Sequence, residues 1–353
     1  MRVLIVRQSS LGDVIHGLPV ACAVKDLIPG AFVAWLAEGW ASEVLVGHAA
    51  IDQRIVVPSS WTRSLPQILR LRRKLRALRF DAVLDLQGVR SSVLAALLSG
   101  APRRLGFVGM VSHELRRLVP NAERQHNLSR AIARPLHFDL VQASSGHIVD
   151  RYLEILAPLG VCSPQVRFGV PESAGDARAV ADLVRDKGVV EQAYALVNPG
   201  GPPFKMWPAD RFAAVARHIG NAHGRPTLVV QGLGERERRA ARDVVAASGG
   251  CALLVPPLPL GQLAALARRS RLFMSGDTGP LHLAAAVGAP CVGLIAHAQA
   301  GWFRPYGPGN VLLQGTPVPT HRARHGGLGV AAMQAIGVDA VCRACDRILG
   351  AQV

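Results

Sequence analysis

Short apolar runs alternate with amphipathic stretches along most of the chain. In the first half, the runs typical of buried strands lie at residues 3–6, 32–36, 54–57 and 82–86, with helical periodicity between them. In the second half, expected strands at residues 194–198, 227–231, 252–255, 272–275 and 291–295 alternate with expected helices at 209–220, 235–247, 260–268 and 281–287. Because strands that alternate with helices form parallel sheets covered on both faces, the pattern predicts an α/β fold in each half.

The α/β pattern is lost between residues 163 and 176, where proline and glycine replace the periodic apolar positions. A chain of 353 residues also exceeds what one core usually supports. We therefore expect an N-terminal domain at residues 1–168, a linker at 169–176 and a C-terminal domain at 177–328. Residues 329–353 are expected to form a last helix, which we allow to pack back toward the N-terminal domain.

Two arginine-rich segments of the first half have different patterns. Residues 63–79 place seven cationic side chains among regularly spaced leucines, which predicts a helix that packs its leucines on the sheet. Its outer face would be basic enough to touch anionic lipid headgroups. Residues 103–134 are also rich in arginine but only weakly periodic, so we expect a long loop or loose helices at the mouth of the functional site.

A strand, a tight turn and a helix are predicted around the sequence SGDTGPLH at residues 275–282. Gly276 and Gly279 allow a close approach of backbone, and Pro280 suits the first position of a helix. Such a turn directs free N–H groups and the positive end of the helix dipole at one point, which makes it a candidate anion site. The alternative is that Asp277 and Thr278 only cap the helix.

A second polar turn follows the expected strand 194–198, with the sequence NPGGPPFKMWP at residues 198–208. Together with the turn at 275–282 it has the features of a nucleotide diphosphate site, with Lys205 as the phosphate contact. The alternatives are a solvated loop lysine at 205 and, for His282, a histidine packed in the interdomain seam.

The first strand leads into the sequence RQSSLGDVIHGLP at residues 7–19, in which a Ser- and Gly-containing turn opens a helix. The GxGxxG pattern is absent, so a nicotinamide cofactor has no support here. Asp13 follows the carboxyl end of the strand, where ligands of open α/β sheets usually bind, although position alone favours a helix cap. Gln87 ends the fourth strand on the same side of the sheet.

Composition adds an electrostatic constraint. The 40 Lys and Arg residues exceed the 24 Asp and Glu residues, and the net charge of +16 favours anionic partners. Aromatic residues do not interleave with the basic ones, so we do not expect nucleic acid binding. The six scattered cysteines are expected to be reduced core residues, and the Cys342–Cys345 spacing alone does not favour a metal or redox role. No signal peptide or membrane-spanning stretch is predicted, which favours a cytoplasmic protein with at most peripheral membrane contact.

Taken together, five segments resemble the ADP-heptose:lipopolysaccharide heptosyltransferases, glycosyltransferase family 9. They are RQSSLGDVIH (7–16), LDLQG (84–88), HIVDRYL (147–153), NPG with KMWP (198–200 and 205–208), and DTG with His282 (277–282). The resemblance implies a GT-B fold, in which two Rossmann-like domains face each other across a cleft. It also implies inverting, metal-independent transfer of heptose from ADP-heptose to the Kdo-lipid A inner core, without a cofactor. The first and third segments are closer to heptosyltransferase I than to heptosyltransferase II, and the subtype stays open.

The resemblance also implies roles for individual residues. Asp13 would be the general base and Lys205 would neutralise the leaving diphosphate. The nucleotide sugar would contact Asn198, Gly200, Lys205, Glu237, Asp277, Thr278, Gly279 and His282. The acceptor would contact Ser9, Ser10, Gly12, His16 and Gln87. Glu237 is our choice for the adenosine ribose, with Glu235 as the alternative because the length of the turn before them is ambiguous.

One departure from the family pattern leaves other functions open. Gly201, Pro202 and Pro203 stand where the family often has a Ser or Thr, and proline offers neither a hydroxyl nor an N–H group. The donor could therefore be another nucleotide sugar, or the acceptor another surface glycan. A noncatalytic nucleotide-sugar-binding protein is the alternative of a different class.

Overall fold

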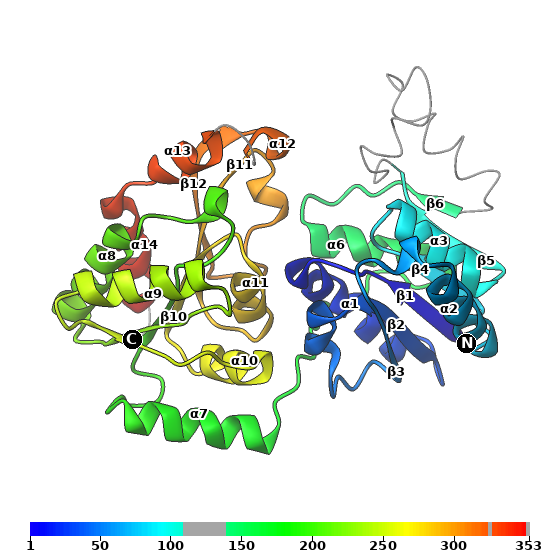
Figure 1. The fold of residues 1–353 in the computed structure, drawn as a ribbon, viewed down its shortest axis with the longest axis horizontal. Helices are drawn as coiled ribbons and strands as arrows, with labels where there is room; N and C mark the ends of the chain where they lie inside the picture. Colours follow the sequence, from blue (N-terminus) through cyan, green and yellow to red (C-terminus); the bar gives the residue numbers. More distant parts are fainter. Residues whose placement is uncertain (109–138, 324–326, 351–353) are drawn as a thin grey trace. The chain divides into compact units, whose positions relative to one another are not determined.

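The computed structural model describes residues 1–108, 139–323 and 327–350 (Figure 1). It divides into two compact units, Met1–Pro171 and Glu172–Val353. The division falls inside the segment expected to be the linker. Most of the second arginine-rich segment, residues 109–134, lies outside the described residues.

The first unit is built on a parallel sheet. Its described residues form six strands in the order β3-β2-β1-β4-β5-β6. The strands are β1 (Arg2–Val6), β2 (Phe32–Glu38), β3 (Gln53–Val57), β4 (Ala82–Asp85), β5 (Arg103–Phe107) and β6 (Asp139–Val141). The helices are α1 (Leu11–Leu27), α2 (Leu65–Ala77), α3 (Arg90–Ser99) and α6 (Ile148–Leu153), with the 3₁₀ turns η1 (Trp40–Leu45), η2 (Trp61–Arg63) and η3 (Glu154–Leu159).

Alternation along β1 explains how helices cover the two faces of this sheet. Leu4 and Val6 face the core cluster that also contains Leu71 and Leu75 of α2. The neighbouring residue Ile5 pairs with Trp35 of β2, which lies on the face covered by α1. β1 is therefore buried from Val3 to Val6, and its carboxyl end fixes the position of the polar turn that follows.

The second unit repeats this plan. Its described residues form six strands in the order β12-β11-β10-β7-β8-β9. The strands are β7 (Ala195–Asn198), β8 (Thr227–Val229), β9 (Ala252–Leu254), β10 (Leu272–Gly276), β11 (Cys291–His297) and β12 (Val311–Val318). The helices are α7 (Ala174–Asp186), α8 (Ala209–His223), α9 (Glu235–Ala247), α10 (Leu260–Arg268), α11 (Gly279–Ala286), α12 (Thr320–Ala323), α13 (Leu328–Gln334) and α14 (Val338–Gly350), with η4 (Pro203–Lys205) and η5 (Ala300–Trp302).

Three strands were not predicted from the sequence. β5 opens with two arginines, in a segment that we expected to be a loop or loose helices, and only its last three residues are buried. β6 spans three residues, none of them fully buried. β12 contains Gly315 and Pro317, which suit an edge strand but weaken the sequence pattern.

The C-terminal segment corrects a further expectation. Instead of one helix it forms α13 and α14, which meet at a bend of 60°. Val341, Ala344 and Ile348 of α14 are buried in the core of the second unit, beside Phe212 of α8. The apolar face of α14 is therefore used within its own unit, and packing of this segment toward the N-terminal domain stays a prediction.

None of the described helices is by itself long and apolar enough to cross a membrane, although the bent pair α13 and α14 together reach that length.

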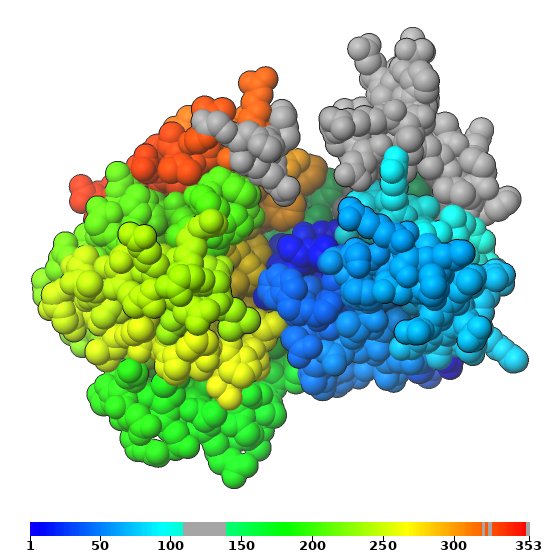
Figure 2. Space-filling view, in the orientation of Figure 1, coloured from blue at the N-terminus to red at the C-terminus, as the bar shows by residue number. Residues whose placement is uncertain are grey.

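The arginine-rich helix α2 lies at the surface of the first unit (Figures 1 and 2). Leu71 and Leu75 are buried, whereas Leu65 and Leu69 are 66% and 49% exposed. The helix therefore covers the sheet with one face, as expected, and presents a mixed basic and apolar face to solvent.

Candidate functional site

In the first unit, the polar turn after β1 organises the candidate site. Ser10 is the N-cap residue of α1, and Asp13 lies in the first turn of that helix. The Asp13 Oδ2 atom accepts hydrogen bonds from the Ser10 backbone N–H at 3.0 Å and from the Ser10 hydroxyl at 2.9 Å. Asp13 is thus a helix-capping residue, as its position favoured, and its carboxylate is still partly exposed.

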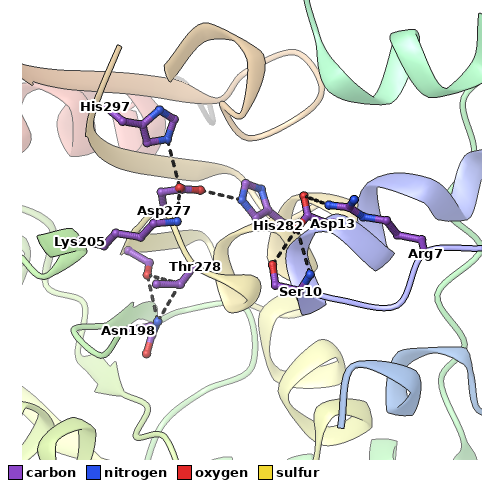
Figure 3. Close-up of polar contacts among 10 residues, drawn as sticks. Arg7, Ser10, Asp13, Asn198, Lys205, Asp277, Thr278, His282 and His297 are labelled. Carbon is purple, nitrogen blue, oxygen red and sulfur yellow. Dashed lines mark hydrogen bonds and ion pairs between the residues drawn. The ribbon is translucent and has the colours of Figure 1, made fainter. Parts of the chain in front are cut away.

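Arg7 holds the other oxygen of the same carboxylate. The Arg7 guanidinium lies 2.7 Å from Asp13 Oδ1 (Figure 3). Burial by itself would raise the pKa of Asp13, but the charge of Arg7 and the hydrogen bonds from Ser10 outweigh it and lower the pKa. Asp13 is therefore ionised at neutral pH and able to accept a proton, although Arg7 makes it a weaker base.

The end of β4 supports this turn from behind. Asp85 is buried and accepts hydrogen bonds from the backbone of Gln87 and Gly88 and from the Ser92 hydroxyl, at 2.9 to 3.0 Å. Burial raises the pKa of Asp85. The side chain of Gln87 in turn accepts a hydrogen bond of 2.8 Å from the backbone N–H of Gln8. Gln87 thus joins the turns after β1 and β4.

The remaining acceptor candidates differ in accessibility. Ser10 is exposed and Ser9 partly so, whereas Gly12 is buried at the start of α1. His16 is 3% exposed, with its ring 6.1 Å from the ring of His147 in an edge-to-face arrangement. The structure therefore places Ser9 and Ser10 where a ligand can reach them, and His16 in the interior beside the N-cap residue of α6.

In the second unit, the two turns that we had selected lie side by side. β7 and β10 are neighbouring parallel strands, and Ser275 is in register with Asn198. The Asn198 side-chain amide donates hydrogen bonds to Ser275 at 3.0 Å and to Thr278 at 3.1 Å (Figure 3). Asn198 therefore fixes one turn against the other at the carboxyl edge of the sheet, the usual ligand position of open α/β sheets.

Asp277 is the centre of this second cluster. Its Oδ2 atom lies 2.5 Å from Lys205 Nζ and 3.1 Å from His297 Nε2, and its Oδ1 atom lies 3.0 Å from His282 Nε2 (Figure 3). Burial would raise the pKa of Asp277, but the hydrogen bonds with the two histidines and the charge of Lys205 hold it well below its usual range. Asp277 is therefore ionised at neutral pH, and its carboxylate contacts Lys205, His282 and His297.

Two glycines of these turns leave room for atoms of the neighbouring turn, where a larger residue would place its Cβ atom. A Cβ atom on Gly276 would lie 2.2 Å from the backbone oxygen of Lys205. Gly201 has φ of +144°, and a Cβ there would lie 2.9 Å from the methyl group of Thr278. The turn that carries Lys205 thus packs directly on the turn that carries Asp277.

The Pro202-Pro203 departure has a structural consequence in this packing. Proline fixes φ, and here Pro203 opens the 3₁₀ turn η4, in which the Lys205 N–H bonds to the Pro202 carbonyl at 2.8 Å. The two prolines cannot contact a ligand as donors. Pro203 instead begins the 3₁₀ turn that ends at Lys205, whose side chain pairs with Asp277.

The structure separates the two candidate acids of α9. Glu237 lies against the turn that follows β7. A Cβ atom on Gly200 of that turn would be only 3.2 Å from Glu237 Cβ. Its Oε2 also accepts a hydrogen bond of 3.3 Å from the Gly234 N–H. Glu235 points into solvent and pairs with Arg242 at 2.5 Å. The geometry favours Glu237 as the acid next to the candidate nucleotide site.

Two residues of these clusters were not singled out from the sequence. Arg7 belongs to the first polar segment but was given no role there. His297 is the last residue of β11, which neighbours β10 at the same sheet edge. A search for polar residues at the carboxyl ends of all neighbouring strands would have found His297, whereas only the fold pairs Arg7 with Asp13.

Known proteins share both the sequence and the fold of this chain. The family model for glycosyltransferase family 9 (heptosyltransferase) matches residues 68–324. Lipopolysaccharide heptosyltransferase 1 of Pseudomonas aeruginosa is 28% identical over 330 residues, which cover 89% of this chain and 83% of the relative. Lipopolysaccharide heptosyltransferase 1 of Salmonella typhimurium is also 28% identical, over 87% of this chain and 92% of the relative.

Solved structures agree on the fold. A glycosyl transferase family 9 protein from Veillonella parvula superposes with a TM-score of 0.81 at 21% identity, covering 99% of this chain and 98% of its own. The E. coli heptosyltransferase WaaC with ADP gives 0.73 at 22% identity, covering 99% and 100% of the two chains. Both units therefore have the parallel α/β architecture of a GT-B fold, as predicted. Because the family model spans most of the chain, this protein belongs to glycosyltransferase family 9, the heptosyltransferases.

Proposed function

We propose that this glycosyltransferase moves heptose from ADP-heptose to the Kdo-lipid A inner core during lipopolysaccharide biosynthesis. The observation that carries the proposal is the Lys205–Asp277 pair of 2.5 Å at the carboxyl edge of the second sheet, with Glu237 beside the adjacent Gly200. A cation held in place beside a helix N-terminus suits a diphosphate, and a nearby acid suits the ribose hydroxyls. The names of the bacterial relatives, lipopolysaccharide heptosyltransferase 1, support the choice of donor sugar and acceptor.

In the proposed reaction, Asp13 removes the proton from the acceptor hydroxyl as that oxygen attacks the anomeric carbon of the heptose. The bond between the anomeric carbon and the diphosphate oxygen breaks on the opposite side, so the anomeric configuration inverts. ADP leaves with the bonding electrons and gains negative charge. Lys205 and the backbone N–H groups at the start of α11 stabilise that charge, which is the role of preorganised donors.

Asp277 has a supporting part in this proposal. Its carboxylate is already bonded to Lys205, His282 and His297, so it does not approach the diphosphate as a free anion. It orients the lysine and the two histidines, and it keeps an ammonium group at the position where the leaving group needs one. The catalytic cation is thus in place before the substrate binds.

A peripheral membrane position fits the same activity. The outer face of α2 carries Arg70, Arg72, Arg73, Lys74 and Arg76 together with the exposed Leu65 and Leu69. A basic helix with exposed leucines suits the anionic cytoplasmic leaflet, where a lipid A acceptor would be embedded. We therefore propose that α2 contacts the cytoplasmic face of the inner membrane. Co-sedimentation with anionic vesicles should fall in the Arg72→Glu/Arg73→Glu variant, and equal sedimentation would contradict this contact.

Two measurements test the proposed reaction. Calorimetry should show selective binding of ADP over UDP and GDP, with at least about 10-fold weaker binding in Lys205→Ala. Turnover of ADP-heptose with Kdo-lipid A should fall by about 10²–10⁴-fold in Asp13→Asn while ADP binding stays intact. A preference for UDP or GDP would point to another sugar donor. ADP binding without any turnover in the native chain would favour a noncatalytic binding protein.

A further inference from the structure

A cluster of metal-ligating side chains lies in the second unit, outside the two candidate sites. His218 and His223 come from α8, and Asp346 comes from α14. The Nε2 atoms of both histidines lie 2.7 Å from the same oxygen, Asp346 Oδ1. The candidate ligand atoms all lie within 4.8 Å of one another.

The position of this cluster is fixed by the core below it. Ile219 of α8 and Val341, Ala344 and Ile348 of α14 are buried in one apolar cluster, so the two helices cannot slide past each other without exposing it. The three polar side chains lie at the rim of that contact, and each is between 18% and 42% exposed. The ligands are therefore held on rigid elements and remain open to an ion from solvent.

The end of α8 adds a favourable electrostatic term for a cation. His223 lies in the last turn, and Gly224, with φ of 61°, ends the helix in the left-handed conformation. The carboxyl end of a helix carries partial negative charge, which favours a positive group there. Asp346 adds a full negative charge.

We propose that His218, His223 and Asp346 form a binding site for a divalent transition-metal ion of the zinc class. Two imidazole nitrogens and one carboxylate oxygen are a ligand set that zinc accepts, with water completing a tetrahedral shell. Ligands about 2.0–2.1 Å from a tetrahedral ion are roughly 3.3 Å apart. The observed distance of 2.7 Å between each Nε2 atom and Asp346 Oδ1 then has to increase by about 0.6 Å when an ion binds.

Cys342 does not belong to this ligand set. It precedes Asp346 by one helical turn, but its sulfur is not among the ligand atoms that lie within 4.8 Å of one another. Cys345 is buried in the core. The Cys342–Cys345 spacing in the sequence therefore marks the right helix for a metal site but not its ligands.

The ion would act on stability and not on the transfer reaction. α8 starts directly after the Lys205 turn, but His218 lies about 14 Å further along this helix. Metal bound there ties the C-terminal helix to α8 and stabilises the folded state by an amount that grows with the logarithm of the free metal concentration once this exceeds Kd. The proposal is thus independent of the proposed reaction, since it is tested by binding and unfolding alone.

The test is calorimetric titration of the full chain, with its cysteines reduced, by ZnCl₂. We expect one ion per chain and at least about 10-fold weaker binding in His218→Ala, in His223→Ala and in Asp346→Asn. Asp339→Asn is the matched control, because it removes a carboxylate from an exposed position on the same helix. This control and Cys342→Ser should bind zinc as the native chain does. Zinc should also raise the melting temperature of the native chain and of the control, but not of the three ligand variants.

Failure of zinc to bind the native chain would overturn the proposal and leave a purely hydrogen-bonded clasp of two histidines and an aspartate. The proposal would also be overturned if all three ligand variants bound zinc with the affinity of the native chain. If one of these variants does not fold, the absorption spectrum of the native chain with Co²⁺ decides. Visible bands of a nitrogen and oxygen environment support the site, whereas a thiolate charge-transfer band would mean cysteine ligation and contradict it.

Discussion

The Arg7 guanidinium lies 2.7 Å from the Asp13 carboxylate, and this ion pair sets the basicity of the proposed catalytic base. The pair joins the residue that directly follows β1 to the first turn of α1, so backbone elements hold it on both sides. A carboxylate held in this way stays ionised at neutral pH, and its proton affinity depends directly on the arginine.

Removal of Arg7 should therefore shift the pH dependence of the reaction. Arg7 lowers the pKa of Asp13, so Arg7→Gln should raise that pKa and move the acidic limb of the kcat/KM profile to higher pH. Arg54→Gln is the control, because Arg54 forms an ion pair with Glu43 on the surface of the same unit. An acidic limb that stays in place in Arg7→Gln would show that Asp13 is not the group that titrates.

His297 should contribute to donor binding through Asp277. Its Nε2 bonds to Asp277, while its Nδ1 is buried without a hydrogen-bond partner among the described residues. His297→Ala should loosen the Lys205–Asp277 pair and weaken ADP binding by about 10-fold, the usual size of one charge-assisted hydrogen bond.

Two variants make the test of His297 specific. His297→Gln keeps a side-chain donor and should restore part of the ADP affinity. Phe303→Leu removes the ring that packs 5.7 Å from His297 but keeps the bond between His297 and Asp277, so it should leave the affinity close to native. Loss of affinity in Phe303→Leu equal to that in His297→Ala would mean that packing, and not the bond to Asp277, is responsible.

The two acids of α9 should differ in their effect on nucleotide binding. Glu237 lies beside Gly200, so Glu237→Gln should weaken ADP binding by about 10-fold if this carboxylate accepts the ribose hydroxyls. Glu235 is paired with Arg242 in solvent, so Glu235→Gln should bind ADP as the native chain does. The affinity of each variant should be measured for ADP and, in a separate titration, for pyrophosphate, because only ADP has a ribose. A Glu237→Gln variant that loses affinity for both ligands would argue against the ribose contact.

Asp277 should make the stability of the second unit sensitive to acid. Its pKa in the folded chain lies well below the value of 3.8 expected for an unfolded aspartate. The stabilisation is thus complete above pH 3.8 and is lost as the pH falls from there toward the folded-state pKa. Urea unfolding of the native chain should show this loss, and Asp277→Asn should be less stable at pH 7 but lose less on acidification. Asp182→Asn, which breaks only an exposed pair with Arg185, should follow the native chain, and an equal acid response in Asp277→Asn would contradict the assignment.

Local patterns predicted the plan of both sheets. α9 and α10 begin and end at the residues expected from periodicity, and most strand positions agree within two residues. Periodicity, caps and turn residues act over a few positions, so they can be recognised without knowledge of the fold. Strands with weak local signals were missed, as in β12, where glycine and proline interrupt the apolar pattern of an edge strand. The C-terminal segment, expected as one helix, forms α13 and α14, because its periodicity shows an apolar face but not where the helix is broken.

The sequence by itself determined which turns carry polar residues, that the chain belongs with the heptosyltransferases, and that both halves are parallel α/β units. Only the tertiary structure decided which side chains meet: His297 with Asp277, and His218 and His223 with Asp346, which is more than a hundred positions away. The reason is that a hydrogen bond requires atoms within about 3 Å, and such distances between remote residues are set by strand order and helix packing. Composition and periodicity describe local stretches of the chain, so they do not give the distances between residues that are remote in sequence.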